Sequence, residues 1–411
     1  MSDCMEEFPV WAEIDLAAVA HNVRELRRAT QPAADLMAVV KADGYGHGAV
    51  EISRQALANG AAWLGVARLD EAEVLREAGI EAPILLFGPT PRSCVRRLRE
   101  LNLTQSVFSL EYARTLSQAA GPAGGPVRVH IKIDTGMGRL GLLDGSGVDC
   151  AGDRQRHEST ETDLARQVEA IVRLPGLHVE GLYTHFAGSD LEDKTFARHQ
   201  LARFLDLVER LRRSGIAFRH VHAANSAALL DLPDSHLDLV RPGIAVYGLY
   251  PSAHVDRSRV VLKPALTLKA RIVQLKEVPA GFKVSYGMTY ETHRPTRIAT
   301  VSVGYADGLR RSLGGRGFML VRGVRAPIVG RVCMDLTMLD VGDIGDLRTG
   351  DEVIVFGGEG TGAPTTDEIA SELGTISYEI ITSIPSRVPR VYLRPETNQA
   401  SPDQNKEGEL P

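Results

Sequence analysis

A lysine at the end of an apolar run is the first residue of this sequence that could do chemistry. The run LMAVVKA covers residues 36–42 and ends on Lys41 and Ala42. Burying an amine is costly unless the amine is paired, deprotonated or bonded covalently. Because desolvation lowers the pKa of an amine and exposes its lone pair, Lys41 is a candidate for a Schiff base. The alternative is a structural lysine whose ammonium group reaches past the strand to solvent.

Three glycines follow Lys41 in the segment ADGYGHG, at positions 44, 46 and 48. Glycine lacks a Cβ atom, so it admits groups that other residues would exclude. The sequence therefore predicts that the backbone and Tyr45 come close to a ligand here.

A second polar segment, VHIKIDTGMGRLG, spans residues 129–141. Alternation along a strand places His130, Lys132 and Asp134 on one face, and Arg139 follows in a glycine-rich loop. The stretch GMGRLG matches the pattern GxGxxG, but that fingerprint requires a helix directly after it in the first unit of a Rossmann half. A Gly- and Asp-rich stretch follows instead, which argues against a dinucleotide site.

Histidines stand at the ends of two further runs. His185 lies in YTHFAGSD, where it is either a site residue or a structural histidine with satisfied hydrogen bonds. His220 and His222 share one face and could bind a metal. No strand end supplies the convergent carboxylates that would complete three or four ligands. We interpret these two histidines as structural and predict no metal site.

Two neighbouring segments have the features of an anion site. Asn225 and Ser226 open a helical stretch, and a hydroxyl beside free backbone N–H groups binds anions. Gly243 and Ile244, in RPGIAVYG, can donate backbone N–H groups nearby. Barrel enzymes commonly bind phosphate at two such adjacent loops. The alternative for Ser226 is a plain helix cap, which predicts no phosphate.

The elements that must position these residues alternate between short apolar runs and amphipathic stretches. Buried parallel strands read as such runs, and the stretches at 71–80 and 199–215 have helical spacing. Eight strand–helix units predict a (β/α)₈ TIM barrel rather than an open doubly wound sheet. The eight runs are residues 36–42, 61–67, 83–88, 104–109, 127–134, 178–186, 218–225 and 239–248.

From about residue 256 the pattern changes to strands joined by Gly-, Pro- and Asp-rich turns, which predicts a mainly β domain over 256–394. Its strands are expected at 265–279, 298–308, 318–343 and 351–359, with a helix at 365–374. The barrel domain is expected over 1–255, although the strand at 9–15 could join the β domain. Asp15 is expected to cap the helix after that strand. Residues 395–411 are expected to form a disordered tail.

The bulk composition narrows the class of protein. The net charge of −5 argues against nucleic acid or an anionic membrane as partner, which leaves a small molecule. No apolar run is long enough to span a membrane, and the first ten residues carry acidic groups where a signal peptide carries basic ones. The four cysteines are scattered and need form no disulfide framework. We expect a cytoplasmic protein.

The motifs together resemble the signatures of the alanine racemase family, in family order from about residue 9 to 393. They are VVKADGYGHG, KIDTGMGRLG, THFAGSD, ANSAALL, RPGIAVYGLYP, SYGMTY, VGYADG, GRVCMD and TISYE. The resemblance implies a barrel followed by a β domain and the cofactor pyridoxal 5′-phosphate (PLP). The positions that match the family's cofactor site are Lys41, Tyr45, His185, Asn225, Ser226, Arg241, Gly243, Ile244 and Tyr378.

The resemblance also implies roles. Lys41 would hold PLP as a Schiff base, Arg241 would face the pyridine nitrogen, and His185 would pack on the ring and touch Tyr286. The phosphate would be held by five residues: Tyr45, Ser226, Gly243, Ile244 and Tyr378. For the substrate carboxylate it implies Arg139 and the Met334 backbone, with Asp335 beside them. It places Tyr305 at the active-site entrance and makes Lys132 a candidate for carbamylation.

The implied reaction interconverts L- and D-alanine and would supply D-alanine for peptidoglycan. A proton must leave one face of the substrate and return to the other, so Lys41 would serve the D-enantiomer and Tyr286 the L-enantiomer. The Tyr286-bearing domain would reach into the barrel of a partner, which predicts a homodimer. By spacing alone, the tyrosines at 286, 305 and 378 could equally be ordinary residues of a β domain.

Other functions stay open from the sequence. A racemase of broader amino-acid specificity would share these motifs. A non-catalytic PLP-binding barrel would lack the β domain, and a metal-dependent barrel hydrolase would use His220 and His222. The segment 142–161 is longer and more polar than the family pattern, and we interpret it as a neutral, disordered insertion on the catalytic face.

Overall fold

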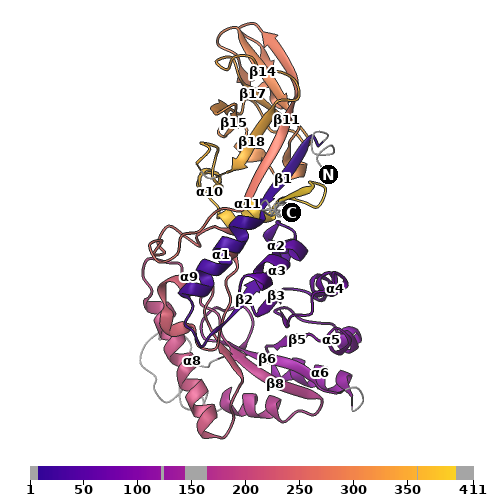
Figure 1. Cartoon of the computed structure of the whole chain (residues 1–411), viewed down its shortest axis with the longest axis vertical. Coiled ribbons are helices and arrows are strands. Elements are labelled where there is room, and N and C mark those ends of the chain that lie inside the picture. Colours follow the sequence, from indigo (N-terminus) through magenta and orange to yellow (C-terminus); the bar gives the residue numbers. More distant parts are fainter. Residues whose placement is uncertain (1–7, 122–124, 144–163, 359, 395–411) are drawn as a thin grey trace, which may run out of the picture.

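A closed ring of parallel strands forms one end of the molecule, and a β domain forms the other (Figure 1). The computed structural model describes residues 8–121, 125–143, 164–358 and 360–394. The expectations for segment 142–161, beyond Leu143, and for the tail 395–411 fall outside these residues. In ring order, the strands are β10 (Leu239–Val240), β2 (Asp35–Val39), β3 (Trp63–Val66), β4 (Ile84–Leu86), β5 (Thr104–Val107), β6 (Val127–Asp134), β8 (Leu177–Tyr183) and β9 (His220–His222).

The ring closes through hydrogen bonds rather than through a regular ladder between β9 and β10. Asp238 donates its backbone N–H to the Val221 carbonyl at 3.0 Å, and Arg241 donates to the Ala224 carbonyl at 2.9 Å. On its other side, β10 pairs in parallel with β2. The predicted barrel is confirmed, and the open sheet is excluded.

Helices cover the outside of the barrel, and their apolar faces pack on its strands. The N-terminal helix α1 packs against α3 and α9 and so fills the place of a helix after β10. The Asp15 side chain caps α1 by accepting from the backbone N–H groups of Ala17 and Ala18, as predicted. The other helices are α3 (Ala49–Ala58), α4 (Leu69–Glu77), α5 (Val95–Glu100), α6 (Leu110–Ala120), α8 (Thr195–Arg213) and α9 (Ser226–Asp231), with α1 at Leu16–Ala29.

The β domain is built around one long strand, β11 (Leu266–Val278), which pairs with β18, β1 and β14. Strand β1 (Val10–Asp15) is antiparallel to β11 and parallel to β19, so the first strand of the chain lies in the sheet of the C-terminal domain (Figure 1). The segment 318–343, predicted as strands joined by turns, contains three strands. The other strands are β14 (Thr296–Val301), β15 (Phe318–Val321), β16 (Val324–Pro327), β17 (Thr337–Asp340), β18 (Glu352–Gly357) and β19 (Arg390–Leu393), and a small pair is β12 (Lys283–Val284) with β13 (Tyr290–Glu291).

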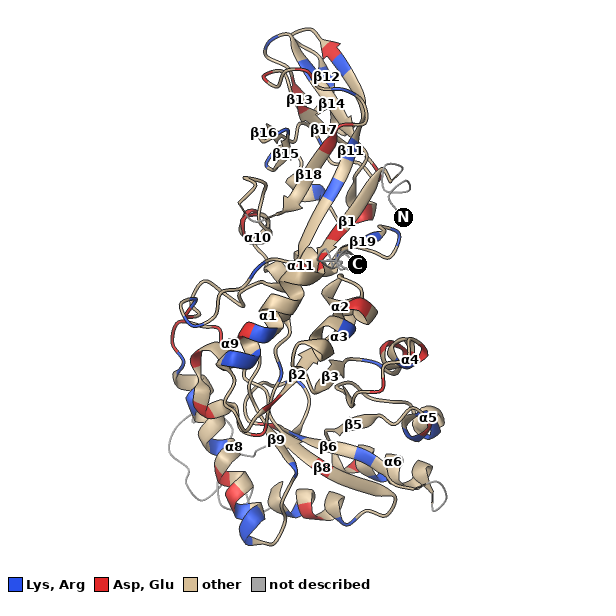
Figure 2. Ribbon diagram, in the orientation of Figure 1, with Lys and Arg blue, Asp and Glu red and all other residues tan. Residues whose placement is uncertain are grey.

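Charged residues of both signs alternate along α8 in Figure 2, and several of them form ion pairs such as Arg213–Glu209 at 3.2 Å. Such a pattern is typical of a solvated helix face. Across the described ranges, every helix is too short or too polar to cross a membrane.

The turn after β2 has a backbone that few sequences tolerate. Strand β2 ends at Val39, two residues before Lys41, and the next residues form α2 (Lys41–Tyr45). Ala42, Asp43 and Tyr45 have φ angles of 54°, 50° and 50°. Such left-handed residues are costly outside glycine and persist where surrounding contacts impose them.

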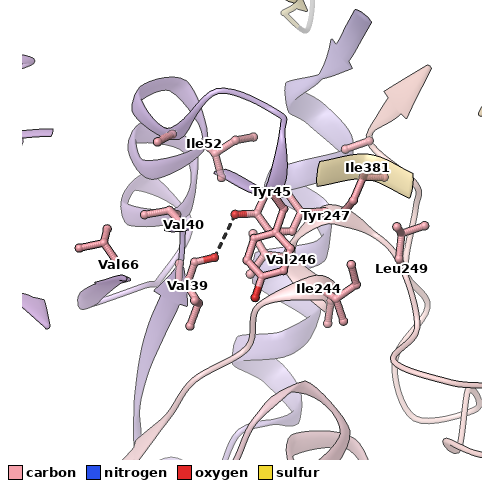
Figure 3. Packing of buried hydrophobic residues seen from close by; sticks show 14 of the residues in the cluster. Val39, Val40, Tyr45, Ile52, Val66, Ile244, Val246, Tyr247, Leu249 and Ile381 are labelled. Carbon is pink, nitrogen blue, oxygen red and sulfur yellow. Dashed lines mark hydrogen bonds between the residues drawn. The ribbon is translucent and has the colours of Figure 1, made fainter. Parts of the chain in front are cut away.

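Those contacts come from the C-terminal end of the chain. The helix α11 (Ser377–Thr382) lies over the turn, and Figure 3 shows Ile381 beside Tyr45 and Tyr247. The Arg390 side chain donates to the Gly46 carbonyl at 3.1 Å.

Two glycines of this turn, Gly46 and Gly48, make room for the C-terminal segment of the same chain, and the approach of a ligand to the backbone and Tyr45 stays a prediction. A Cβ added at Gly46 would lie 2.3 Å from the Ile381 carbonyl oxygen, and one at Gly48 would lie 1.9 Å from the Tyr392 hydroxyl. The missing side chains admit the C-terminal segment, which locks the turn that carries Lys41.

This packing predicts an effect on stability. We expect Gly46→Ala to lower the free energy of unfolding by about 3 kcal/mol or more, because a left-handed residue then also meets a backbone carbonyl. The matched control is Gly79→Ala, which has φ +77° but open space around it. It should cost only about 1 kcal/mol. Denaturant unfolding measures both changes in free energy. Equal losses of stability would contradict the role of the C-terminal segment in holding this turn.

Candidate active site

A cavity of about 590 Å³ opens at the carboxyl ends of the barrel strands. It collects most of the residues that the sequence singled out, from six segments of the chain. These are Lys41, Tyr45, Lys132, Arg139, His185, Asn225, Ser226, Arg241, Gly243, Ile244 and Tyr378. Tyr378 comes from α11, so the β domain closes one side of a barrel cavity.

Lys41 stands at the wall of this cavity with a pKa below its usual value. Burial is the main cause, and the positive charge of Arg139 adds to it, while Glu71 acts in the opposite direction. Glu71 accepts the backbone N–H of Ala42 at 2.6 Å and that of Ala67 at 2.7 Å, so it ties the Lys41 turn to the next strand. Sequence reasoning missed Glu71, whose only signal was its place in the first turn of α4.

Four cations surround the cavity: Lys41, Lys132, Arg139 and Arg241. Burial and the nearby arginines lower the pKa of Lys132 to about 8. Asp190 is the one carboxylate among the described residues that line the cavity. A cavity lined by so many cations attracts an anionic ligand.

Arg241 is buried, and its guanidinium donates at 2.7 Å to His222 Nδ1 and at 2.8 Å to the Thr184 carbonyl. His185 Nδ1 lies 3.3 Å from the same guanidinium. The ion pairs found across the described residues do not include Arg241, and burial lowers its pKa to about 10. Since a guanidinium only donates, both histidines accept through Nδ1 and carry their proton on Nε2.

These histidines are neutral. Burial, followed by the charge of Arg241, lowers the pKa of His185 and His222 well below the ordinary value. His222 also meets His130 at 2.9 Å, so both of its ring nitrogens are engaged. The described residues contain no group of three or more His, Cys, Asp and Glu side chains suited to a metal.

The opposite end of the cavity gathers hydroxyl groups around Gly243. Ser226 Oγ accepts the backbone N–H of Gly243 at 2.9 Å, which leaves its own hydrogen to donate. A Cβ at Gly243 would lie 2.5 Å from the Tyr45 hydroxyl, so this glycine admits that hydroxyl. The Asn225 side chain accepts from Ala228 N–H at 3.0 Å and caps α9. Such donors suit a phosphate.

The loop that carries Arg139 is organised by Asp134, at the end of β6. Its carboxylate accepts four backbone N–H groups, from Gly136, Met137, Gly138 and Arg139, at 2.8–3.1 Å. Burial acts to raise the pKa of Asp134, but these four donors outweigh it and lower the pKa overall. The sequence placed Asp134 on the correct face without revealing this role.

Four predicted site residues lie elsewhere in the same chain. Tyr286, Tyr305, Met334 and Asp335 do not line the Lys41 cavity, and Tyr286 is 71% exposed. Three segments meet around Cys333. Ser285 Oγ lies 3.6 Å from the Cys333 sulfur, and Tyr305 donates its backbone N–H to the Cys333 carbonyl at 3.0 Å. Together they form one face of the β domain, which we call the Tyr286 face. Contact between His185 and Tyr286 does not occur within one chain.

Comparison with known proteins agrees with this fold and cavity. Residues 14–251 match the family model of the alanine racemase N-terminal domain, and residues 265–392 match that of the C-terminal domain. The chain is 55% identical to the alanine racemase of Desulfosudis oleivorans over 94% of this chain and 97% of that protein. It is 44% identical to that of Methanococcus maripaludis over 95% and 100%.

Solved structures give the same result. The alanine racemase of Clostridium difficile 630 superposes with a TM-score of 0.86 at 36% identity, covering 94% of this chain and 96% of that one. The alanine racemase of Bacillus anthracis with bound L-Ala-P gives 0.82 at 37%, covering 94% and 95%. Fold, cavity and comparisons define an isomerase built on a barrel and a β domain. The chain belongs to the alanine racemase family.

The Asp134 contacts predict a pH-dependent contribution to stability. A carboxyl whose pKa is depressed on folding stabilises above its unfolded pKa, and this contribution is lost as pH falls through the folded value. We therefore expect Asp134→Asn to cost about 1–2 kcal/mol at neutral pH and progressively less in acid. Unfolding across pH measures this, with exposed Asp346→Asn as the control. A loss that stays constant with pH would contradict it.

Proposed function

We propose that this chain interconverts L- and D-alanine with PLP, using Lys41 and the Tyr286 of a partner subunit as the two bases. The observation that carries this is the desolvated Lys41 amine in a cavity lined by cations. An amine with a lowered pKa has more of the free base at neutral pH, and a base is what removal of the alanine α-hydrogen requires.

The residues present fit PLP. Its phosphate suits the hydroxyl groups of Tyr45, Ser226 and Tyr378 beside the backbone N–H of Ile244, while the Gly243 N–H orients the Ser226 hydroxyl. Arg241 would face the ring nitrogen, and Lys41 would hold the cofactor through its amine. When bound, PLP would delocalise the electron pair left by the α-hydrogen.

Two bases on opposite faces account for inversion. Lys41 Nζ would take the α-hydrogen from one face, and the Tyr286 hydroxyl of the partner would return a proton to the other. His185 supports the tyrosine: because Arg241 donates to its Nδ1, its Nε2–H is free to donate to a phenolate. An adjacent donor of this kind favours the charged form of tyrosine.

The proposal requires a homodimer with shared sites. The Tyr286 face is exposed and carries apolar side chains, with Met288 and Met334 more than half exposed. Exposed apolar clusters of this kind usually mark an interface. In the dimer, Tyr305 would stand at the entrance, and Met334 and Asp335 would approach the substrate carboxylate.

From the barrel side, Arg139 would bind that carboxylate, and Lys132 would orient Arg139. A pKa of about 8 leaves Lys132 partly neutral at physiological pH, and a neutral amine can react with CO₂. A carbamate at Lys132 would turn a cation into an anion beside Arg139 and orient it. Carbon-13 NMR with labelled CO₂ tests for the carbamate: the wild type should show a carbamate resonance that Lys132→Met lacks. Identical spectra of the two proteins would reject the carbamate.

The relatives support alanine as the substrate, since they are named alanine racemases and one is solved with bound L-Ala-P. We also propose that the enzyme acts in the cytoplasm and that its D-alanine supplies peptidoglycan. A racemisation assay over a panel of amino acids tests substrate breadth. Faster turnover of another amino acid would reject alanine as the preferred substrate.

Lys41→Ala should abolish the visible absorbance of bound PLP and reduce racemisation by about 10³-fold or more, because both covalent attachment and one base are lost. Absorption spectra and polarimetry measure the two effects. Lys276→Ala, an exposed lysine on β11, is the control and should retain both. Unchanged absorbance in Lys41→Ala would mean that another amine holds the cofactor.

Mixed dimers test the shared site. Lys41→Ala and Tyr286→Phe homodimers should each be nearly inactive, with Tyr286→Phe impairing α-hydrogen exchange of L-alanine far more than of D-alanine. Co-refolding the two variants gives heterodimers with one intact site, so about a quarter of wild-type activity should return. No recovery on mixing, with dimers present by light scattering, would place both bases within one chain.

A further inference from the structure

A column of polar side chains starts at the cavity and runs through the interior of the barrel. It begins at Arg241, passes through His222 on β9 and His130 on β6, and reaches Glu180 on β8. The successive distances are 2.7 Å from Arg241 to His222 Nδ1, 2.9 Å from His222 Nε2 to His130 Nδ1, and 3.7 Å from His130 Nε2 to Glu180 Oε1.

Hydrogen-bonding rules fix every proton in this column. Arg241 can only donate, so His222 Nδ1 accepts and its Nε2 carries the proton. That proton is donated to His130 Nδ1, which leaves the His130 proton on Nε2. This atom has no hydrogen-bond partner among the described residues, and the Glu180 carboxylate lies beyond hydrogen-bond distance, at 3.7 Å. Both histidines are neutral, because burial lowers the pKa of each well below the ordinary value.

The barrel makes room for the column at the expense of apolar packing. Barrel interiors are normally filled by branched apolar residues. Here a Cβ at Gly181 would lie 2.6 Å from the His130 ring, so this position admits the imidazole. Tyr183 stacks on His222 at 4.7 Å, and Trp63 packs on His130 at 5.6 Å. Both imidazole rings therefore pack against aromatic neighbours.

Glu180 supplies the negative end. It is buried, accepts the Thr104 hydroxyl at 2.8 Å, and lies 3.9 Å from Arg128. The Glu180 carboxylate acts on His130 Nε2–H by its charge across 3.7 Å. The hydrogen bonds that join His130, His222 and Arg241 polarise one another, so this charge alters the donor at the other end. Glu180 thereby makes the His130 and His222 nitrogens better acceptors and makes Arg241 a weaker acid.

We propose that His222, His130 and Glu180 are positioning residues that set how strongly Arg241 donates toward the cavity and so hold the reaction to racemisation. This rests on the proposed function, in which Arg241 faces the ring nitrogen of PLP. A weaker donor there withdraws less charge through the ring, so the electron pair released at the alanine Cα returns to Cα.

The reaction that the column suppresses is half-transamination. In it the alanine Cα would be oxidised and the aldehyde carbon of PLP reduced. The electron pair from Cα and a proton would end on that carbon, the amino group would stay there, and water would supply the keto oxygen of the departing pyruvate. Each event leaves one pyruvate and one cofactor in its amine form. The amount of pyruvate formed per racemisation turnover therefore reports how strongly Arg241 donates to the ring nitrogen.

The proton positions are tested first, by neutron diffraction of the full-length protein. We expect deuterium on Nε2 of both His222 and His130 and on neither Nδ1 atom. Deuterium on Nδ1 of either ring, or on both nitrogens of one ring, overturns the column. This measurement does not depend on racemase activity, so it remains decisive if the protein proves to have another function.

The function of the column is tested with Glu180→Gln, which keeps the size of the side chain and removes its charge. We expect pyruvate formation per turnover to rise about tenfold, with a matching rise in cofactor bound as the amine. Glu209→Gln, which removes an exposed carboxylate on α8, should leave the ratio at the wild-type value.

An unchanged ratio in Glu180→Gln with active enzyme overturns the proposal while leaving racemisation intact. A merely structural role would lower activity and thermal stability without altering the ratio. If Glu180→Gln does not fold, His130→Gln provides the same comparison, because it interrupts the column one step closer to Arg241. A wild-type protein that binds no PLP and does not racemise alanine would instead reject the proposed function.

Discussion

The buried guanidinium of Arg241 is the constraint on which the site depends. A fully buried cation without a carboxylate partner is tolerated only when every donor finds an acceptor. Backbone carbonyls at the ends of neighbouring strands and two neutral histidines supply those acceptors. The same contacts fix the tautomers of His185 and His222, so one cation determines the proton positions on both sides of it.

A second consequence of the fold is that the two domains share one site even within a single chain. The turn after Val39 holds Lys41 in a left-handed backbone that the C-terminal residues stabilise, through Ile381 and Arg390. Tyr247 lies behind this turn and donates to the Val39 carbonyl at 2.9 Å (Figure 3). The β domain therefore sets the position of the barrel's reactive amine and also presents the Tyr286 face.

Local sequence signals identified much of the fold. The alternation of apolar runs predicted the barrel, and the change of pattern near residue 256 predicted the β domain, because side-chain period and turn residues are local properties. Strand limits were less accurate: the predicted run 36–42 ends at Val39 in the structure. Its last residues, although apolar in part, are bent into a turn by contacts from residues far along the chain.

By itself the sequence determined which chemical groups this protein has: an amine after a buried strand, a glycine-rich loop with an arginine, and hydroxyls beside a helix start. Tertiary structure decided what those groups contact. The roles of Glu71, Asp134 and Glu180 were invisible in the sequence, because each acts through a partner that only folding brings within a few ångströms. The contacts of Gly46 and Gly48 were invisible for the same reason, since the atoms that they admit belong to Ile381 and Tyr392, more than three hundred positions away.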